Sequence, residues 1–522
     1  MKKLWGNQNN GDGRSAAATD GEQDSGLPPD EHTRLLPNRV ESTSYLSPDD
    51  PAVSPYNLWT VRITRYFTVF FTAVALIWWL ALLITAFVTP PGFHTRGSGF
   101  FSFSFASLAL VNLLFTLLFF SIPSKAVRIL SFVISAILLI DTVLLLSVQK
   151  TRIEEGWVGI ASILWAFAMA IWTLVTDRLV AWGKSEEEER LTGRAESRRT
   201  LTEWVAVLAA TFVMIILTIV VILMTCTLIL RALDAGLAPP GKTYWVDDKR
   251  YKIHVYCEGN ATNSHGVEIP TVLLDGDGPV EHGLWDFVNH AVKNGSISRY
   301  CFVDRPGFAW SDTAPSPLSA GMAVEAIEEA LARAGEEGPW VLMSAGIGSI
   351  YSRILSARLG RRVKGILLVD PLHEDYLKDV ANPGHGFLLW LRGIISPLGL
   401  DRVPGALFKG RTKEDRVWGR SAYQTGKYIY AKLQENLVAE TLSRRDVASS
   451  RAIQRPDVPL SLITSGQQLR EDEDWENKQR DLSHLTHQLQ HWDVVNKAPH
   501  EVWRTLEGRE TMEKRLRQLV HG

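Results

Sequence analysis

Five long apolar segments in the first half of this 522-residue chain limit its possible folds more than any other feature. Each is close to the ~20 residues that a helix needs to cross the hydrocarbon core of a bilayer. Helices of soluble proteins carry a polar stripe, whereas these segments are apolar all round. The sequence therefore predicts an N-terminal all-α transmembrane bundle over residues 58–230, with the lipid bilayer as its partner. Its five spans are approximately residues 66–88, 101–122, 129–148, 157–175 and 204–229.

Residues 1–57 precede the bundle and are rich in Gly, Ser, Asp, Asn and Pro. Such a composition cannot bury a hydrophobic core, so we expect a disordered N-terminal tail. The tail lacks the apolar segment of a cleavable signal peptide. Its stretch Glu31-His32-Thr33-Arg34-Leu35-Leu36 resembles the acidic dileucine signals that direct membrane proteins to vacuoles or endolysosomes.

The distribution of basic residues predicts the orientation of the bundle. Lys and Arg are concentrated before the first span and between the fourth and fifth spans. By the positive-inside rule, the N-terminus is cytosolic and the C-terminal half faces a lumen or the cell exterior. Two N-glycosylation sequons, beginning at Asn260 and Asn294, lie in that half. We therefore expect a multi-pass membrane glycoprotein, with an endomembrane or the vacuole as the favoured location.

Charge and cysteine content argue against several classes of protein. The net charge is −2 and no long basic stripe is present, so we expect no nucleic-acid partner. The three cysteines fit neither a disulfide-rich scaffold nor a zinc spacing, and nothing in the chain indicates a metal or a cofactor. Asp141 interrupts the third span, but one carboxylate outlines no ion pathway. A transporter or channel is therefore the weakest interpretation.

Beyond residue 242, short apolar segments of strand length alternate with helical patterns. This alternation is typical of a doubly wound, mostly parallel sheet with helices on both faces. The predicted strands are 251–257, 271–274, 300–303, 340–343, 365–369, 460–463 and 493–495. His484, His487 and His491 fall at helical spacing, which predicts a helix before the last strand.

Several motifs in this half resemble those of the α/β-hydrolases. Residues 302–312, Phe-Val-Asp-Arg-Pro-Gly-Phe-Ala-Trp-Ser-Asp, resemble the segment after the fourth strand of that fold. Three further segments resemble parts of the same fold: the strand before the oxyanion loop (residues 270–274), the lead into the elbow strand (338–340) and the sixth strand (366–371). With five spans in front, the chain looks like fungal multi-pass membrane proteins that carry a C-terminal α/β-hydrolase domain. The resemblance implies such a domain over residues 242–520, with a helical lid at about residues 371–458.

The resemblance also places the strands that carry Cys257 and Cys301 side by side. A disulfide bond between them and two buried free thiols are both reasonable there.

The elbow that should carry the nucleophile has none. In α/β-hydrolases the fifth strand leads into Gly-x-Ser-x-Gly at the start of a helix. Here the five positions read Ser344-Ala345-Gly346-Ile347-Gly348, so Gly346 stands where the attacking serine belongs. Glycine suits the strained backbone of the elbow at little cost. Ser344, two residues upstream, could act as the nucleophile only if the elbow were shifted.

The resemblance assigns the two other members of the catalytic triad. His500 follows the last predicted strand and is the expected general base. Asp370, at the end of the sixth predicted strand, is the expected acid, with Glu374, Asp375 and Asp472 as reserves. The alternative for His500 is a purely structural histidine, and the alternative for Asp370 is an N-cap of the following helix. The expected oxyanion donors are backbone N–H groups around Asp275, Gly276 and Ile347. An acidic residue at 275, in place of the usual histidine, counts against acyl transfer.

Three functional interpretations follow. The first is a membrane-anchored hydrolase of a lipophilic ester or acyl substrate, using His500 and Asp370 with Ser344 or a water as the attacking group. The second is a catalytically inactive hydrolase domain that binds a lipid or a partner. The third, a transporter, is the weakest for the reason given above.

Overall fold

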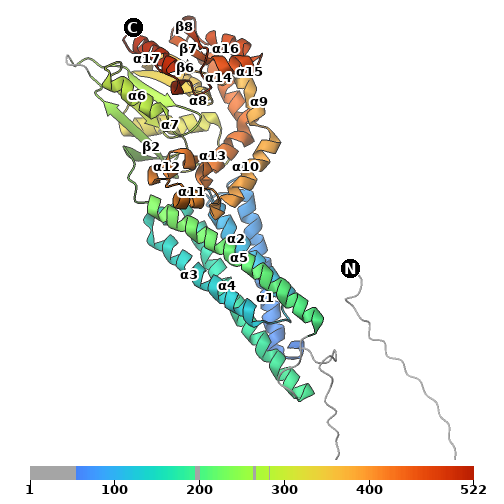
Figure 1. Cartoon of the computed structure of the whole chain (residues 1–522). Helices are drawn as coiled ribbons and strands as arrows, with labels where there is room; N and C mark the ends of the chain where they lie inside the picture. The colour runs from blue at the N-terminus through green and yellow to red at the C-terminus, as the bar shows by residue number, and fades with distance from the viewer. Residues whose placement is uncertain (1–54, 194–199, 263–265, 281, 522) are drawn as a thin grey trace, which may run out of the picture.

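The computed structural model describes residues 55–193, 200–262, 266–280 and 282–521. Almost all of the predicted tail, including the dileucine pattern, lies outside these residues. Residues 55–57, predicted as part of the tail, form a short 3-10 helix. Figure 1 shows an elongated molecule with a helical bundle at one end and a sheet-containing unit at the other.

Five helices form the bundle, and all are long and apolar enough to cross a membrane. They are α1 (Trp59–Thr85), α2 (Phe100–Leu118), α3 (Lys125–Ser147), α4 (Gln149–Thr192) and α5 (Leu201–Asp234). Each includes most of one predicted span. The 44-residue α4 is much longer than predicted and is kinked at Gly156, which has a φ of +60°. Its C-terminal part is polar and extends beyond the apolar segment, so a prediction based on hydropathy could not detect it.

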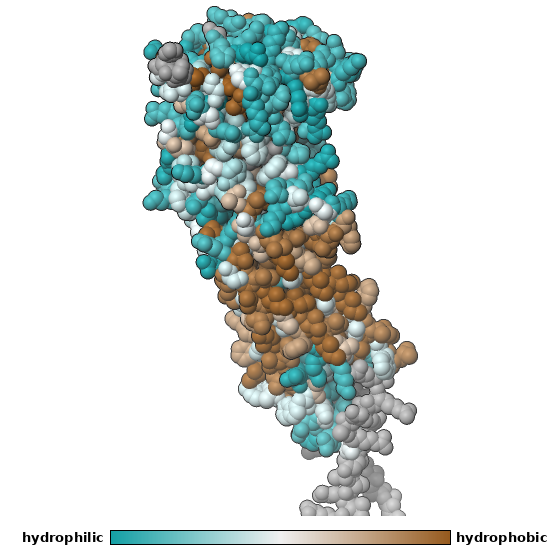
Figure 2. All heavy atoms as spheres, turned by 60° about the vertical axis from the view of Figure 1, so that its left-hand side comes forward, coloured by the Kyte–Doolittle hydropathy of each residue, from teal (hydrophilic) through white to brown (hydrophobic). Residues whose placement is uncertain are grey.

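On the face of the bundle shown in Figure 2, a broad apolar band lies between hydrophilic surfaces above and below it. The band includes exposed side chains such as Phe70, Ile77 and Phe212. Between the helices, two indole N–H groups are satisfied by hydroxyls: Trp78 donates to Ser162 (3.0 Å) and Trp79 to Ser107 (2.8 Å). An outward apolar band with internally paired polar groups is what lipid requires. The chain is a multi-pass membrane protein.

The C-terminal unit is built on an eight-stranded sheet in the order β1-β2-β4-β3-β5-β6-β7-β8. β2 pairs antiparallel with β1 and β4, and the remaining pairs are parallel. The order and pairing are those of the α/β-hydrolase fold, as predicted. The strands are β1 (Lys242–Val246), β2 (Tyr251–Gly259), β3 (Thr271–Asp275), β4 (Arg299–Val303), β5 (Trp340–Ala345), β6 (Val363–Val369), β7 (Pro459–Ser465) and β8 (Gln488–Val495).

Two details of the predicted strands were wrong. β1 was not predicted; it is an edge strand whose first four residues are exposed or partly exposed, so it lacks the apolar pattern of a buried strand. The helical spacing of three histidines was also misleading, because His491 lies in β8 and His487 in the loop before it. β8 is mostly exposed along its first residues, so it lacks the apolar pattern that marks the central strands.

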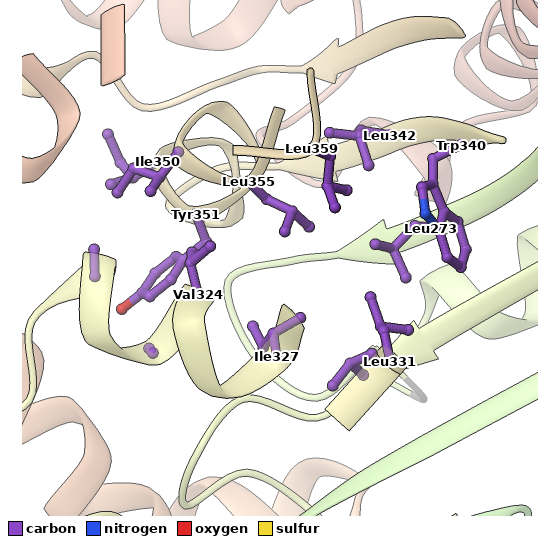
Figure 3. Packing of buried hydrophobic residues seen from close by; sticks show 14 of the residues in the cluster. Leu273, Val324, Ile327, Leu331, Trp340, Leu342, Ile350, Tyr351, Leu355 and Leu359 are labelled. Carbon is purple, nitrogen blue, oxygen red and sulfur yellow. The ribbon is translucent and has the colours of Figure 1, made fainter. Parts of the chain in front are cut away.

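Helices cover both faces of the sheet. On one face, α7 (Ala320–Ala334), α8 (Gly348–Leu359) and α14 (Arg444–Ile453) pack over a core that includes Trp340 and Leu342 (Figure 3). On the other face, α6 (Leu284–Lys293) and α17 (Leu506–His521) cover residues such as Met343 and Leu367. Alternate residues of each central strand thus enter opposite cores.

The residues predicted as the lid form helices between β6 and β7. Besides α14 they are α9 (Leu377–Val380), α10 (Pro383–Ile395), α11 (Arg402–Phe408), α12 (Lys413–Val417) and α13 (Gly426–Val438). Figure 1 shows α11 and α12 at the end of α5, between the bundle and the sheet. Buried side chains join the two units: Arg416 contacts Asp234 at 2.6 Å, and Arg96 contacts Asp312 at 2.6 Å. The lid is therefore also the junction between the bundle and the sheet.

Candidate active site

The elbow has the backbone geometry of an α/β-hydrolase. Gly346 follows β5 with a φ of +53°, and α8 begins two residues later at Gly348. A side chain at Gly348 would come within 2.8 Å of the backbone N of Gly276. Both glycines are thus explained by local geometry, one by its positive φ and the other by the close approach of the loop after β3.

The structure brings His500 and Asp370 together. His500 lies in the loop after β8, and its Nδ1 is 2.6 Å from Oδ2 of Asp370. Asp370 follows β6 and is fully buried. Its other oxygen accepts hydrogen bonds from the Ser465 backbone N–H (3.0 Å) and the Trp475 indole (3.1 Å). Those donors fix the carboxylate so that it orients the imidazole.

A second carboxylate, which the sequence reasoning missed, occupies the other side of this imidazole. Nε2 of His500 is 2.7 Å from Oδ2 of Asp277, in the loop after β3. Oδ1 of Asp277 accepts the Ile347 backbone N–H at 2.6 Å. A Cβ built on Gly346 would overlap the carboxylate of Asp277. This carboxylate therefore occupies the space in which a nucleophilic side chain would stand.

Two of the three predicted oxyanion donors, the backbone N–H groups of Gly276 and Ile347, are not available to a substrate oxygen. The Ile347 N–H is bound by Asp277, and the Gly276 N–H donates to Oδ1 of Asp275 at 2.7 Å. A carboxylate at each donor also repels a developing oxyanion. The sequence signal is a pair of acidic residues, Asp275 and Asp277, on either side of Gly276. Only Asp275 was identified as a departure from the usual oxyanion loop.

The two carboxylates change the protonation of His500. Burial alone would lower the pKa of the imidazole, but hydrogen bonds and ion pairing with Asp277 and Asp370 outweigh it and raise the pKa to about 10. Burial would raise the pKa of Asp277, and its contacts with His500 reverse this and hold it below the ordinary value. At neutral pH the group is an imidazolium between two carboxylates. It has no free lone pair with which to accept a proton.

Arg305, from the hydrolase-like motif, holds the loop that carries Asp277. Its guanidinium donates to the Gly276 carbonyl at 2.6 Å and contacts Glu435 of α13 at 2.9 Å. It also lies 3.3 Å from Asp275. Burial raises the pKa of Asp275 to about 6, although Arg305 opposes this rise. The buried arginine thus ties the oxyanion loop to the lid.

Ser344 is not placed beside His500. Its hydroxyl lies 2.6 Å from that of Ser352 in α8, and the residue is buried. The Ser349 hydroxyl donates to the Gly346 carbonyl at 2.7 Å. Among the described residues, no hydrogen bond links either serine to the imidazole.

The remaining predicted residues lie at the surface or between two strands. Cys257 of β2 and Cys301 of β4 are directly opposite in the sheet and form a disulfide bond. Asn260 and Asn294 are exposed, just after β2 and α6.

Two clusters within the described residues have the atom types of a metal site. In the first, Cys257, Cys301 and Glu336, the two sulfurs are joined in a disulfide bond and are not free thiolates. In the second, His373, Glu374 and Asp481 lie close together. Arg353 contacts Glu374 at 2.7 Å, and Arg451 contacts Asp481 at 2.6 Å. Because arginines already neutralise both carboxylates, the second cluster fits a metal ion poorly.

Comparison with known proteins adds relatives of the whole chain. A family model described as a region of unknown function (DUF2417) matches residues 31–257. The chain is 32% identical to the Uncharacterized protein C23C11.06c of Schizosaccharomyces pombe over 527 residues, covering 94% of this chain and 97% of that protein. It is 25% identical to an uncharacterized vacuolar membrane protein of Saccharomyces cerevisiae over 389 residues, covering 62% of this chain and 59% of the yeast protein.

Solved structures were also matched. A haloalkane dehalogenase variant from Bradyrhizobium elkanii is 12% identical, with a TM-score of 0.39, over 53% of this chain and 95% of that one. An enol-lactonase from Burkholderia xenovorans is 16% identical, with a TM-score of 0.36, over 54% of this chain and all of that one.

Proposed function

The chain belongs to the family of fungal membrane proteins that includes the Schizosaccharomyces pombe protein, and from this premise we propose a membrane-anchored binding protein. In this proposal the α/β-hydrolase domain no longer performs serine-type hydrolysis and binds a lipid or a partner protein instead. The bundle fixes that domain beside the bilayer.

The single observation that carries the proposal is the position of Asp277. Its carboxylate stands against Gly346, binds His500 at 2.7 Å and takes the Ile347 N–H at 2.6 Å. One side chain thereby fills the nucleophile position, holds the general base in its protonated form and blocks an oxyanion donor. Acyl transfer needs all three to stabilise its transition state.

Restoring a serine tests this proposal. The full-length protein in detergent micelles is treated with a fluorophosphonate probe, which labels activated serines. We expect no labelling of the wild type or of Gly346→Ser, because the new side chain meets the Asp277 carboxylate. Asp277→Gly combined with Gly346→Ser should be labelled, since His500 can then accept the serine proton. Asp277→Gly alone is the matched control without a nucleophile.

Labelling of the wild type at any serine would contradict the proposal. If the double variant is folded and unlabelled, the elbow and His500 do not form the latent site that the proposal requires.

Hydrolysis of a lipophilic ester by an activated water is the second candidate. His500 and Asp277 keep 31% and 41% of their side chains exposed, so a small molecule can reach them. This route requires a neutral imidazole, and the pKa of about 10 confines it to alkaline pH. Ester hydrolysis that rises between pH 8 and 10, and that disappears in His500→Ala, would favour this candidate over a binding module.

We further propose that the N-terminus is cytosolic and that the hydrolase domain lies in the lumen of an endomembrane, with the vacuole favoured. The basic flanks of the spans, the exposed sequons at Asn260 and Asn294 and the pairing of Cys257 with Cys301 support this orientation. Glycosidase treatment should shift the mobility of the wild type and not of an Asn260→Gln/Asn294→Gln variant. Cleavage of the hydrolase domain by protease added to the cytosolic side of sealed vesicles would contradict the orientation.

A further inference from the structure

A cavity of about 90 Å³ lies at the junction of the bundle, the lid and the loop after β3. It is distinct from the candidate active site, although Pro279, two residues beyond Asp277, lines it. A single water needs ~10–15 Å³ on this measure, so the cavity has room for several waters or one compact polyatomic group.

Cations outnumber acids in the wall of this cavity. Five basic side chains line it, whereas Glu154 and Asp234 are its only acidic residues among the described lining. The basic residues are Lys150, Arg231, Arg402, Arg416 and Lys427. Counting full charges, and including Glu155, which lies outside the lining and pairs with Arg231, the excess of positive charge is two. Buried charges are normally paired, so this excess needs an explanation.

Two of the five cations are fully paired. Arg231 of α5 contacts Glu154 at 2.8 Å and Glu155, outside the lining, at 2.7 Å. Arg416 of α12 contacts Asp234 at 2.6 Å. These pairs use both lining acids and leave little negative charge for the other three cations.

The other three cations are less well paired: Lys150 and Lys427 form no salt bridge with a described residue, and Arg402 has only a longer contact with Asp234. Lys150 lies 5.2 Å from the Trp310 ring and forms no salt bridge with any described residue. The Lys427 ammonium donates only to the carbonyls of Ala309 (3.2 Å) and Ser311 (2.8 Å). Arg402, which is 7% exposed, reaches Asp234 at 3.4 Å and leaves its Nε without a partner.

The electrostatic environment agrees with this geometry. Burial lowers the pKa of Arg402 to about 10, with Asp234 opposing and Arg231 and Arg416 adding to the effect. Burial also lowers the pKa of Lys427; Glu154, Asp312 and Asp304 oppose this, and Lys150 lowers the pKa further. The first turn of α13, from Gly426, also lines the cavity and adds the positive end of a helix dipole.

We propose that this cavity binds a phosphate group. A phosphate dianion accepts several charge-assisted hydrogen bonds and would supply most of the missing negative charge. The cavity lies at the N-terminal end of α4 and the C-terminal end of α5. A groove of about 640 Å³ shares Lys150 and Glu154 with it and is lined by apolar residues such as Val148, Ile153 and Leu237. A phosphomonoester lipid headgroup and free inorganic phosphate both provide the recognised chemistry.

The test uses the full-length protein in detergent micelles. Native mass spectrometry compares binding of phosphatidic acid and phosphatidylcholine with identical acyl chains, and thermal unfolding compares inorganic phosphate with chloride at equal ionic strength. The variant is Lys150→Gln/Lys427→Gln. Lys150→Gln alone is expected to disturb folding less than the double variant, because Lys150 has no hydrogen-bond or salt-bridge partner among the described residues that the substitution would leave unpaired. Lys293→Gln, exposed on α6, is the matched control.

We expect the wild type to prefer a phosphate ligand at least tenfold, and the double variant to lose at least tenfold in affinity while Lys293→Gln is unchanged. Binding of phosphatidic acid without stabilisation by inorganic phosphate identifies a lipid headgroup. Stabilisation by inorganic phosphate alone identifies a soluble ligand. Equal binding of both lipids with no phosphate effect, or undiminished binding by a folded double variant, overturns the proposal. Serine labelling in the wild type would refute the silent active site and leave this result untouched.

Discussion

The candidate active site and the junction cavity both bury several charges, but they balance them differently. Around His500, two carboxylates neutralise one imidazolium, and both backbone donors nearby are already bound. At the junction, two of five cations have no salt bridge with a described residue, and a third shares Asp234 with Arg416. The first region is complete without a ligand, whereas the second gains from an anion. Ancestral catalytic residues and ligand recognition therefore need not coincide in this fold.

The largest expected effect comes from removing one acid in each region. Asp234→Ala leaves the buried guanidinium groups of Arg416 and Arg402 without a carboxylate, which costs about 3–5 kcal/mol and should lower the melting temperature by on the order of 10 °C. Asp370→Ala should cost less, because His500 keeps its ion pair with Asp277. Phosphate should restore part of the loss only in Asp234→Ala, because only that vacancy opens into the cavity. Thermal unfolding of the full chain with and without phosphate measures this.

If phosphate restores both variants equally, or neither, the contrast between the two regions is not supported.

A smaller effect is expected from pH. The folded-state pKa of His500 is about 10, above an unfolded value of ~6.5. The imidazolium pair therefore adds stability that is fully present below pH ~6.5 and is lost as pH rises through about 10. We expect the melting temperature of the wild type to fall over this range more steeply than that of Asp277→Asn, which weakens the pair.

Diethyl pyrocarbonate provides an independent measurement, because it modifies neutral imidazole. At pH 7.5, mass spectrometry should find His500 unmodified in the wild type and modified in Asp277→Asn. Rapid modification of wild-type His500 would show that the imidazole is neutral and able to serve as a base.

The smallest expected effect is that of Ser344→Ala. The change removes one buried hydrogen bond with Ser352, worth about 1 kcal/mol, and leaves both charged regions intact. Stability should fall slightly, and phosphate binding should not change. Loss of any hydrolytic activity in this variant would reopen Ser344 as a nucleophile.

The bundle and the fold class were predictable from sequence because local patterns determine them. Apolar segments of membrane length identified all five helices, although the polar end of α4 extended beyond its apolar segment. The pairing of His500 with Asp370 followed from the order of motifs along the chain. Asp277 was missed because its role depends on the direction in which one loop side chain points, and the spacing of residues along the sequence does not predict that direction.

The sequence by itself determined that this chain crosses a membrane, carries an α/β-hydrolase fold and lacks a serine at the elbow. Hydropathy, the alternation of strand and helix patterns, and the identity of single residues are enough to predict these properties. Only the tertiary structure decided what fills the vacant position and where positive charge accumulates. Asp277 meets Gly346, which lies 69 positions later in the sequence, and Lys150, Arg402 and Lys427 come from α4, α11 and α13. Electrostatic balance is a property of distance in space, and distance in space is set by folding.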